Sequence, residues 1–176
     1  MILKANAIVI KSFPYSETSL ISRLLLNNGE KMTIMIKGAR SLKSNKNALF
    51  QSINLIDMSY YYKENREIQL FKEGTLIKDF SNLKKDFKCM KYALSIIDII
   101  DKALPKRYKD QLMFDISYKS LSEINHINNY KIIFIFFLLA FSHYNGYSIN
   151  HLKFNSISSE EALDLFISND IKYYNN

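Results

Sequence analysis

The sequence is poor in the residues that build covalent cross-links and metal clusters. Its 176 residues include one cysteine, Cys89, no tryptophan, two prolines and four glycines. A single thiol excludes a disulfide within the chain and any Cys-rich zinc module. The three histidines, His126, His143 and His151, lack companions at metal-ligand spacing. We therefore expect no metal site and no cofactor.

Catalytic patterns are equally scarce. The acidic residues Asp57, Glu64, Glu67 and Glu73 show no paired spacing that suggests a metal-bound nuclease, and no Gly-rich loop could cradle a phosphate. We expect a protein that is not an enzyme. The apolar run 132–141 is too short to cross a bilayer, and the N-terminal stretch lacks a signal-peptide cleavage site, so we expect a cytoplasmic protein without membrane contact.

Positive charge is what the sequence has in excess. Lys and Arg number 24 against 17 Asp and Glu, a net charge of +7. Residues 1–78 carry 12 of these cations against 6 acids, whereas residues 79–176 carry 12 against 11. Because the excess lies in the N-terminal part, it favours a site for a polyanion such as nucleic acid there.

The N-terminal part reads as short strands. Met32, Ile34 and Ile36 alternate with residues of the opposite face, and Asn27–Gly29 supplies a hairpin turn before them. The five predicted strands cover residues 5–13, 18–26, 31–37, 53–61 and 67–77. Closing them would remove exposed edges and give a five-stranded OB-fold barrel, predicted as a domain over residues 1–79.

From Phe80 the apolar period becomes helical, which predicts an all-α domain over residues 80–176. The first helix should run from Phe80 to Leu104, where Pro105 stops it. Further helices are predicted at 111–124, at 131–144 with Gly146 as the C-cap, and from Ser158 onward. The buried stripe of the first helix should hold Leu83, Phe87, Met90, Leu94, Ile97 and Leu104. The fold class is therefore α+β.

The candidate site is electrostatic rather than catalytic. Lys37, Arg40, Lys43 and Lys46 fall in one segment after the third strand, where Gly38 lets the backbone approach a ligand closely. A single nucleic-acid strand passing this segment would meet the four cations in succession. Lys11 and Arg23 on neighbouring strands could extend the track, and Tyr15 could stack on a base. Phe13 and Phe71 also offer rings, but we expect both to be buried.

Short motifs along residues 1–150 resemble the RecO family of bacterial recombination mediators and DNA repair proteins. Their order, with Lys-Gly-Ala-Arg at the end of the third strand, carries the resemblance. The motifs are Ala7–Lys11, Pro14–Leu20, Lys37–Arg40, Gln51 with Leu55, Ser59–Tyr61, Leu83–Phe87, Ile99–Pro105 and Gly146–Tyr147.

The resemblance implies an N-terminal OB-fold and a helical C-terminal part. It implies binding to single-stranded and duplex DNA, annealing of complementary strands, and a nucleoid-associated location. The implied partners are RecR and the acidic C-terminal tail of the single-stranded-DNA-binding protein, with which such proteins load recombinase onto coated strands. Lysines and arginines of the helical part could receive that tail: Lys84, Lys88, Lys91, Lys102 and Arg107.

The chain also departs from the family pattern. Ser16 stands where the family often has glycine, Asn45 where a second arginine is common, and Ser52 where proline is frequent. Many members carry a four-cysteine zinc module after the Gly-Tyr pair, and residues 148–154 contain no cysteine. We therefore expect a reduced helical domain without zinc.

Two other functions remain open from the sequence. The chain could be a protein–protein adaptor with weak DNA binding, since its helical part is reduced. It could also be an RNA-binding OB protein, because the fold alone does not choose a nucleic acid.

Overall fold

The structure is a computed structural model that describes residues 1–105, 108–126 and 130–146. Five strands come first: β1 (Ile2–Tyr15), β2 (Ser19–Leu26), β3 (Lys31–Ile36), β4 (Leu55–Tyr61) and β5 (Ile68–Lys78). A short helix, α1 (Lys46–Leu49), lies between β3 and β4. The helices α2 (Ser81–Lys85), α3 (Phe87–Ala103), α4 (Gln111–His126) and α5 (Tyr130–Tyr144) follow. All five strands lie close to their predicted positions.

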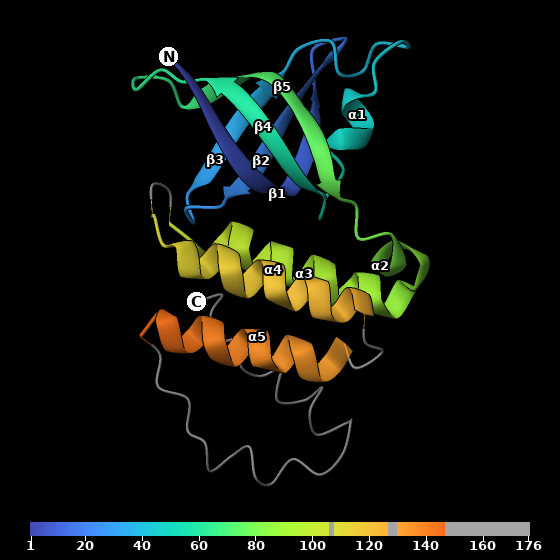
Figure 1. Cartoon of the computed structure of the whole chain (residues 1–176), viewed down its shortest axis with the longest axis vertical. Coiled ribbons are helices and arrows are strands. Elements are labelled where there is room, and N and C mark those ends of the chain that lie inside the picture. The colour runs from blue at the N-terminus through green and yellow to red at the C-terminus, as the bar shows by residue number, and fades with distance from the viewer. Residues whose placement is uncertain (106–107, 127–129, 147–176) are drawn as a thin grey trace, which may run out of the picture. The chain divides into compact units, whose positions relative to one another are not determined.

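The strands close into a barrel in the order β1-β2-β3-β5-β4, with β4 pairing back to β1 (Figure 1). All neighbours are antiparallel except β3 and β5, which are parallel. This is the predicted five-stranded OB-fold barrel. The Asn27–Gly29 turn joins β2 to β3, and Gly29 has the positive φ of +82° that such a turn requires.

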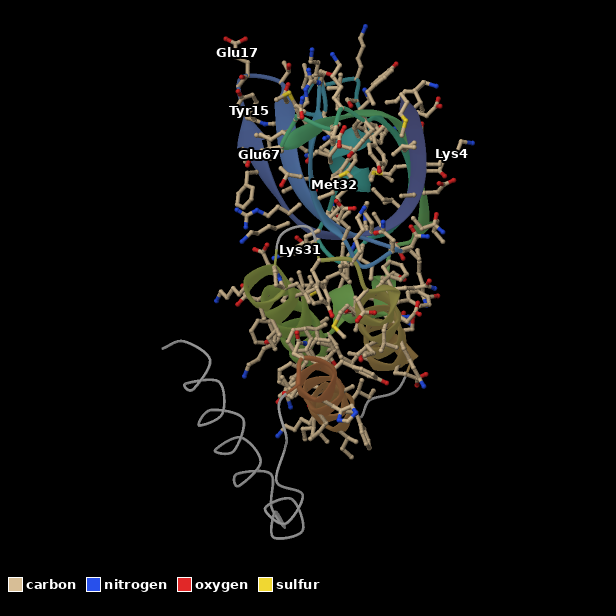
Figure 2. All side chains as sticks on the ribbon, turned by 90° about the vertical axis from the view of Figure 1, so that its left-hand side faces the viewer. Lys4, Tyr15, Glu17, Lys31, Met32 and Glu67 are labelled. Atoms are coloured by element: carbon tan, nitrogen blue, oxygen red, sulfur yellow. The ribbon has the colours of Figure 1, made fainter. Side chains whose placement is uncertain are left out.

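Alternating side chains fill the barrel. Met32, Ile34 and Ile36 of β3 are buried in its interior, and Figure 2 shows Met32 within the ring of strands. Ala7 and Val9 of β1 belong to the same cluster. Ile8 and Ile10, on the opposite face of β1, are equally buried, and α3 contacts this strand. Helix α3 therefore packs against the outside of the barrel at β1.

Residues 1–141 belong to one compact unit. The division predicted between residues 79 and 80 stays a prediction. Among the residues that the structure describes, no helix is both long and apolar enough to cross a membrane. The helix predicted from Ser158 lies outside the described residues.

The long first helix was predicted wrongly. The chain forms two helices there, because Asp86 adopts an extended conformation and caps the second one. The Asp86 carboxylate accepts hydrogen bonds from the backbone N–H groups of Lys88 and Cys89, as an N-cap does. The buried face of α3 is formed by Cys89, Tyr92, Ala93, Ile96, Ile97, Ile100 and Asp101. Phe87 and Leu94, assigned to the buried stripe, are exposed instead.

The other helices agree with the sequence pattern. The third predicted helix corresponds to α5, and Gly146 follows it with a φ of +82°, as expected of a C-cap glycine. Its backbone N–H donates to the carbonyl oxygen of His143 at 3.1 Å. Cys89 is buried, as expected of a structural thiol, and burial raises its pKa, with a further contribution from the Asp86 charge.

Candidate nucleic-acid interface

Residues 37–45, here called the β3–β4 loop, leave β3 through a left-handed turn at Gly38, where φ is +66°. The loop is held by short-range hydrogen bonds. The Ser41 hydroxyl donates to the carbonyl oxygen of Gly38 at 2.9 Å, and the Ser44 N–H donates to that of Ser41 at 2.9 Å. Its backbone therefore has a defined path, on which Lys37, Arg40, Lys43 and the following Lys46 are exposed.

Arg40 ties this loop to the turn between β1 and β2. Its backbone N–H donates to the carbonyl oxygen of Thr18 at 2.8 Å, and its guanidinium Nη1 donates to that of Ser16 at 3.1 Å. Ser16 has a φ of +51°, in the left-handed region that favours glycine. A glycine at this position, which the family resemblance implies, would adopt this conformation without strain. Tyr15, one residue earlier, is 46% exposed.

A groove separates the loop and α1 from β5. It has a volume of about 880 Å³ and is called the β5 groove below. Lys43 and Lys46 lie on one side, and Lys72 of β5 lies on the other. The groove is lined by Gly38, Ser41, Lys43, Ser44, Asn45, Lys46, Ala48, Leu49, Phe71, Lys72, Glu73, Gly74, Thr75 and Leu76. The structure therefore adds Lys72 to the predicted cations.

Glu73 is the single acid that lines this groove in the part of the chain that the structure describes, and it already has partners. The Lys72 ammonium lies 3.1 Å from the Glu73 carboxylate, and the Ser59 hydroxyl donates to the same oxygen at 3.2 Å. The hydrogen bond from Lys72 lowers the pKa of Glu73, as do its charge and the bond from Ser59. Within the described residues, neither Lys43 nor Lys46 is paired with a carboxylate, so the loop side of the groove keeps its positive charge.

Lys37 faces a second, smaller hollow of about 310 Å³ over the β3–β5 pair. Arg66, from the loop between β4 and β5, lines the same hollow. The buried Gln69 amide shapes that loop: it donates to the carbonyl oxygens of Lys63 and Arg66 at 3.0 and 2.6 Å, and accepts from the Lys63 N–H. Arg66 is a cation that the sequence reasoning missed.

Lys11 and Arg23 lie opposite each other on β1 and β2, as predicted, but both contact Asp101 of α3. The Asp101 side chain is only 4% exposed. Its backbone carbonyl also accepts a hydrogen bond from Lys31 at 2.6 Å. Figure 2 shows Lys31 where the barrel meets the helices, and Tyr15 and Glu17 at the opposite end. Lys11 and Arg23 therefore join barrel to helix, and their contact with DNA stays a prediction.

The candidate aromatic rings divide into exposed and buried ones. Phe71 is buried, as expected, and packs edge-on against Phe50 with ring centroids 5.0 Å apart. Phe13 was expected to be buried but is 42% exposed, with Lys11 and Arg23 over its ring. Tyr61 is 42% exposed. Tyr15, Phe13 and Tyr61 thus remain available to stack on a base.

The lysines proposed for a partner do not form one cluster of equivalent groups. Lys84 donates to the side-chain oxygen of Asn54 at 2.6 Å, and burial lowers its pKa, with the Asp79 charge opposing. Lys102 pairs with Asp98 at 2.7 Å, and this hydrogen bond raises its pKa. Lys88 and Lys91 are exposed on α3. Arg107 lies outside the described residues.

The described residues hold no group of three or more His, Cys, Asp and Glu side chains placed to bind a metal ion. His143 is exposed, and its ring packs edge-to-face against the ring of Tyr144. His151, the His126 side chain and residues 148–154 lie outside what the structure describes.

Two family models match the chain. "Recombination protein O N terminal" matches residues 1–80, and "Recombination protein O C terminal" matches residues 84–153. The chain is 29% identical over 164 residues to the DNA repair protein RecO of Pelodictyon phaeoclathratiforme, covering 93% of this chain and 62% of that protein. It is 30% identical over 140 residues to the RecO protein of Chlorobium limicola, covering 79% and 54%.

The RecO protein of Salinibacter ruber is 27% identical over 124 residues, covering 70% of this chain and 48% of that protein. The chain therefore spans less than two thirds of the length of these relatives. The two family models match the chain in order, and the OB-fold barrel followed by helices agrees with them. The chain belongs to the RecO family, whose members have a role in DNA repair and recombination.

Proposed function

We propose that the chain binds single-stranded DNA across the exposed cations of the β3–β4 loop and α1. The observation that carries this proposal is that Lys37, Arg40, Lys43 and Lys46 are all exposed, and that none is paired with a carboxylate within the described residues. Phosphates bind to such groups by displacing condensed counterions. Lys72 and Arg66 extend the surface on either side.

Aromatic rings support the preference for single strands. Tyr15 is the last residue of β1, next to Ser16, whose carbonyl oxygen Arg40 contacts, and 46% of Tyr15 is exposed. An unpaired base stacked on such a ring contributes about 1–3 kcal/mol without sequence preference. Duplex DNA, whose bases are stacked already, would use the phosphate contacts alone and bind more weakly.

The wider role follows from the family. We infer that the chain anneals complementary strands and helps to load recombinase onto strands coated by the single-stranded-DNA-binding protein, together with RecR and that protein's C-terminal tail. This role requires no catalytic turnover. Exposed lysines on α3, including Lys88 and Lys91, are the candidates for receiving the acidic tail.

The test is oligonucleotide binding by fluorescence anisotropy. Replacing Lys37, Arg40, Lys43 and Lys46 by alanine should weaken binding of a labelled single-stranded oligonucleotide by about tenfold or more at moderate salt. The matched control removes four exposed lysines from α2, α3 and α4 instead: Lys85, Lys88, Lys91 and Lys119. Equal loss in both variants would refute the loop site. Competition with an RNA oligonucleotide of the same sequence separates a DNA-binding from an RNA-binding protein.

A further inference from the structure

Beyond Leu70, no strand of the described part of the chain lies along one edge of β5. The parallel pairing of β3 with β5 ends where Met35 lies opposite Leu70, because β3 stops at Ile36 and the chain turns away at Gly38. β5 continues to Lys78, paired with β4 on its other side. Within the described residues, residues 71–76 make no backbone hydrogen bond other than those of the β4 ladder. These residues form the wall of the β5 groove.

An uncovered strand edge offers a row of N–H and C=O groups that another extended chain can pair with. The β5 groove gives such a chain room, since its volume is about 880 Å³. It also offers apolar contacts, because Leu49 and Leu76 line it and Leu76 is 48% exposed. Alternate side chains of an added strand would point toward these residues and away from them.

The charges around the β5 edge indicate which kind of molecule the β5 groove binds. Lys43, Lys46 and Lys72 line the groove, and its one acid, Glu73, is already bound by Lys72 and Ser59. A second copy of this chain, with its net charge of +7, would bring charge of the same sign. A nucleic acid cannot continue a β-ladder, and Phe71, the only aromatic side chain that lines the groove among the described residues, is buried. An acidic polypeptide can pair with the backbone groups of the β5 edge and also carries the negative charge that the lysines attract.

We propose that the β5 groove binds an extended acidic peptide segment of a partner protein, which adds to the β5 edge as a further strand. This inference goes beyond DNA binding because it needs no nucleic acid, although Lys43 and Lys46 would serve both ligands in turn. The site is also distinct from the helical lysines discussed above. Affinity would come from backbone pairing, and preference for acidic sequences from Lys43 and Lys46, since Lys72 already pairs with Glu73.

The experiment uses the full chain and a labelled short peptide of alternating glutamate and valine. The matched probe is the same peptide N-methylated at every residue, which keeps the charge but removes the N–H donors of both edges. We expect the unmodified peptide to bind about tenfold more tightly, because the methylated peptide cannot donate backbone hydrogen bonds to the β5 edge. We also expect it to slow hydrogen exchange at the amides of residues 71–76.

Two neighbouring substitutions provide the control within the protein. Leu76→Glu places a negative charge in the groove, whereas Ile77→Glu places the same charge on an adjacent residue that does not line it, and the two side chains are 48% and 49% exposed. Peptide binding should fall with Leu76→Glu and persist with Ile77→Glu. The proposal would be overturned if the methylated peptide bound as tightly as the unmodified one, or if both substitutions weakened peptide binding equally. Slower hydrogen exchange at residues away from β5 would also overturn it. None of these outcomes depends on the DNA affinity of the chain.

Discussion

Arg23 on β2 donates from one guanidinium nitrogen to both carboxylate oxygens of Asp101 on α3, at 3.1 Å to each. The two residues are far apart in the sequence, and Lys11 reaches the same carboxylate from β1. A carboxylate at the end of the first long helix thus holds two neighbouring strands of the barrel. This contact connects the barrel to the helical part through charge rather than through apolar packing alone.

The first prediction concerns this contact. Asp101→Asn removes the charge from a side chain that is 4% exposed and leaves Lys11 and Arg23, themselves 38% and 48% exposed, without their partner. We expect the free energy of unfolding to fall by about 1–3 kcal/mol, less than for a fully buried pair. Thermal or urea unfolding measures it. Asp98→Asn on the same helix breaks only the exposed pair with Lys102 and should barely change stability. Equal effects would contradict a special role for Asp101.

The same carboxylate predicts a pH dependence. Burial alone would raise the pKa of Asp101, but the hydrogen bonds and charges of Lys11 and Arg23 outweigh it, and the pKa lies below its ordinary value. The stabilisation is therefore fully present above the pKa of the unfolded chain, about 3.9, and is lost as pH falls through the folded pKa. The stability gap between the native chain and Asp101→Asn should shrink on acidification below about pH 4. A gap that stays constant down to pH 2 would refute this assignment.

The second prediction concerns the β1–β2 turn. Ser16 adopts a φ of +51°, which costs a residue with a Cβ about 1–2 kcal/mol. Ser16→Gly should relieve part of that strain and raise the free energy of unfolding by about 0.5–1 kcal/mol, with the carbonyl still available to Arg40. Glu17→Gly, next in the same turn and without a positive φ, should not stabilise the chain. If both changes destabilise equally, strain at Ser16 is not the reason for glycine in relatives.

The third prediction compares two glycines with positive φ. A Cβ at Gly29 would lie 1.9 Å from the carbonyl oxygen of Asp110, whereas one at Gly38 would meet nothing within 4 Å. Gly29→Ala should therefore cost more than about 3 kcal/mol, because backbone must move. Gly38→Ala should cost about 1 kcal/mol through its φ alone. Urea unfolding of the two variants measures both losses of stability. Similar losses would show that the Asp110 backbone does not lie against Gly29.

The strands were predictable from the sequence because alternation and turn residues are local signals. Met32, Ile34 and Ile36 alternate over one short strand, and the turn before them requires the positive φ that Gly29 supplies. The helical register was harder. The sequence pattern placed Asp86 inside one long helix, but its side chain caps the start of α3. Because α3 begins anew there, its buried face contains Tyr92 and Ile96 rather than Phe87 and Leu94.

The site was predictable only in part. Residues 37–46 carry four cations and no acid, and this run of charge can be recognised in the sequence without a structure. Arg66 was missed because acids surround it in the sequence, so its loop looks neutral. Its place beside Lys37 depends on the parallel pairing of β3 with β5, and the Asp101 contact depends on how α3 meets the barrel. Neither long-range contact has a local sequence signal.

The central claim is that the loop cations bind the phosphates of single-stranded DNA, and the salt dependence of binding tests it most directly. If about six phosphates are neutralised, a plot of log K against log salt should have a slope of about −4. Replacing Lys37, Arg40, Lys43 and Lys46 by alanine should make that slope shallower by about 3, while the helix variant lacking Lys85, Lys88, Lys91 and Lys119 keeps the native slope. The claim would be contradicted if the slope were unchanged in the variant lacking Lys37, Arg40, Lys43 and Lys46. It would also be contradicted if the slope became equally shallow in the helix variant.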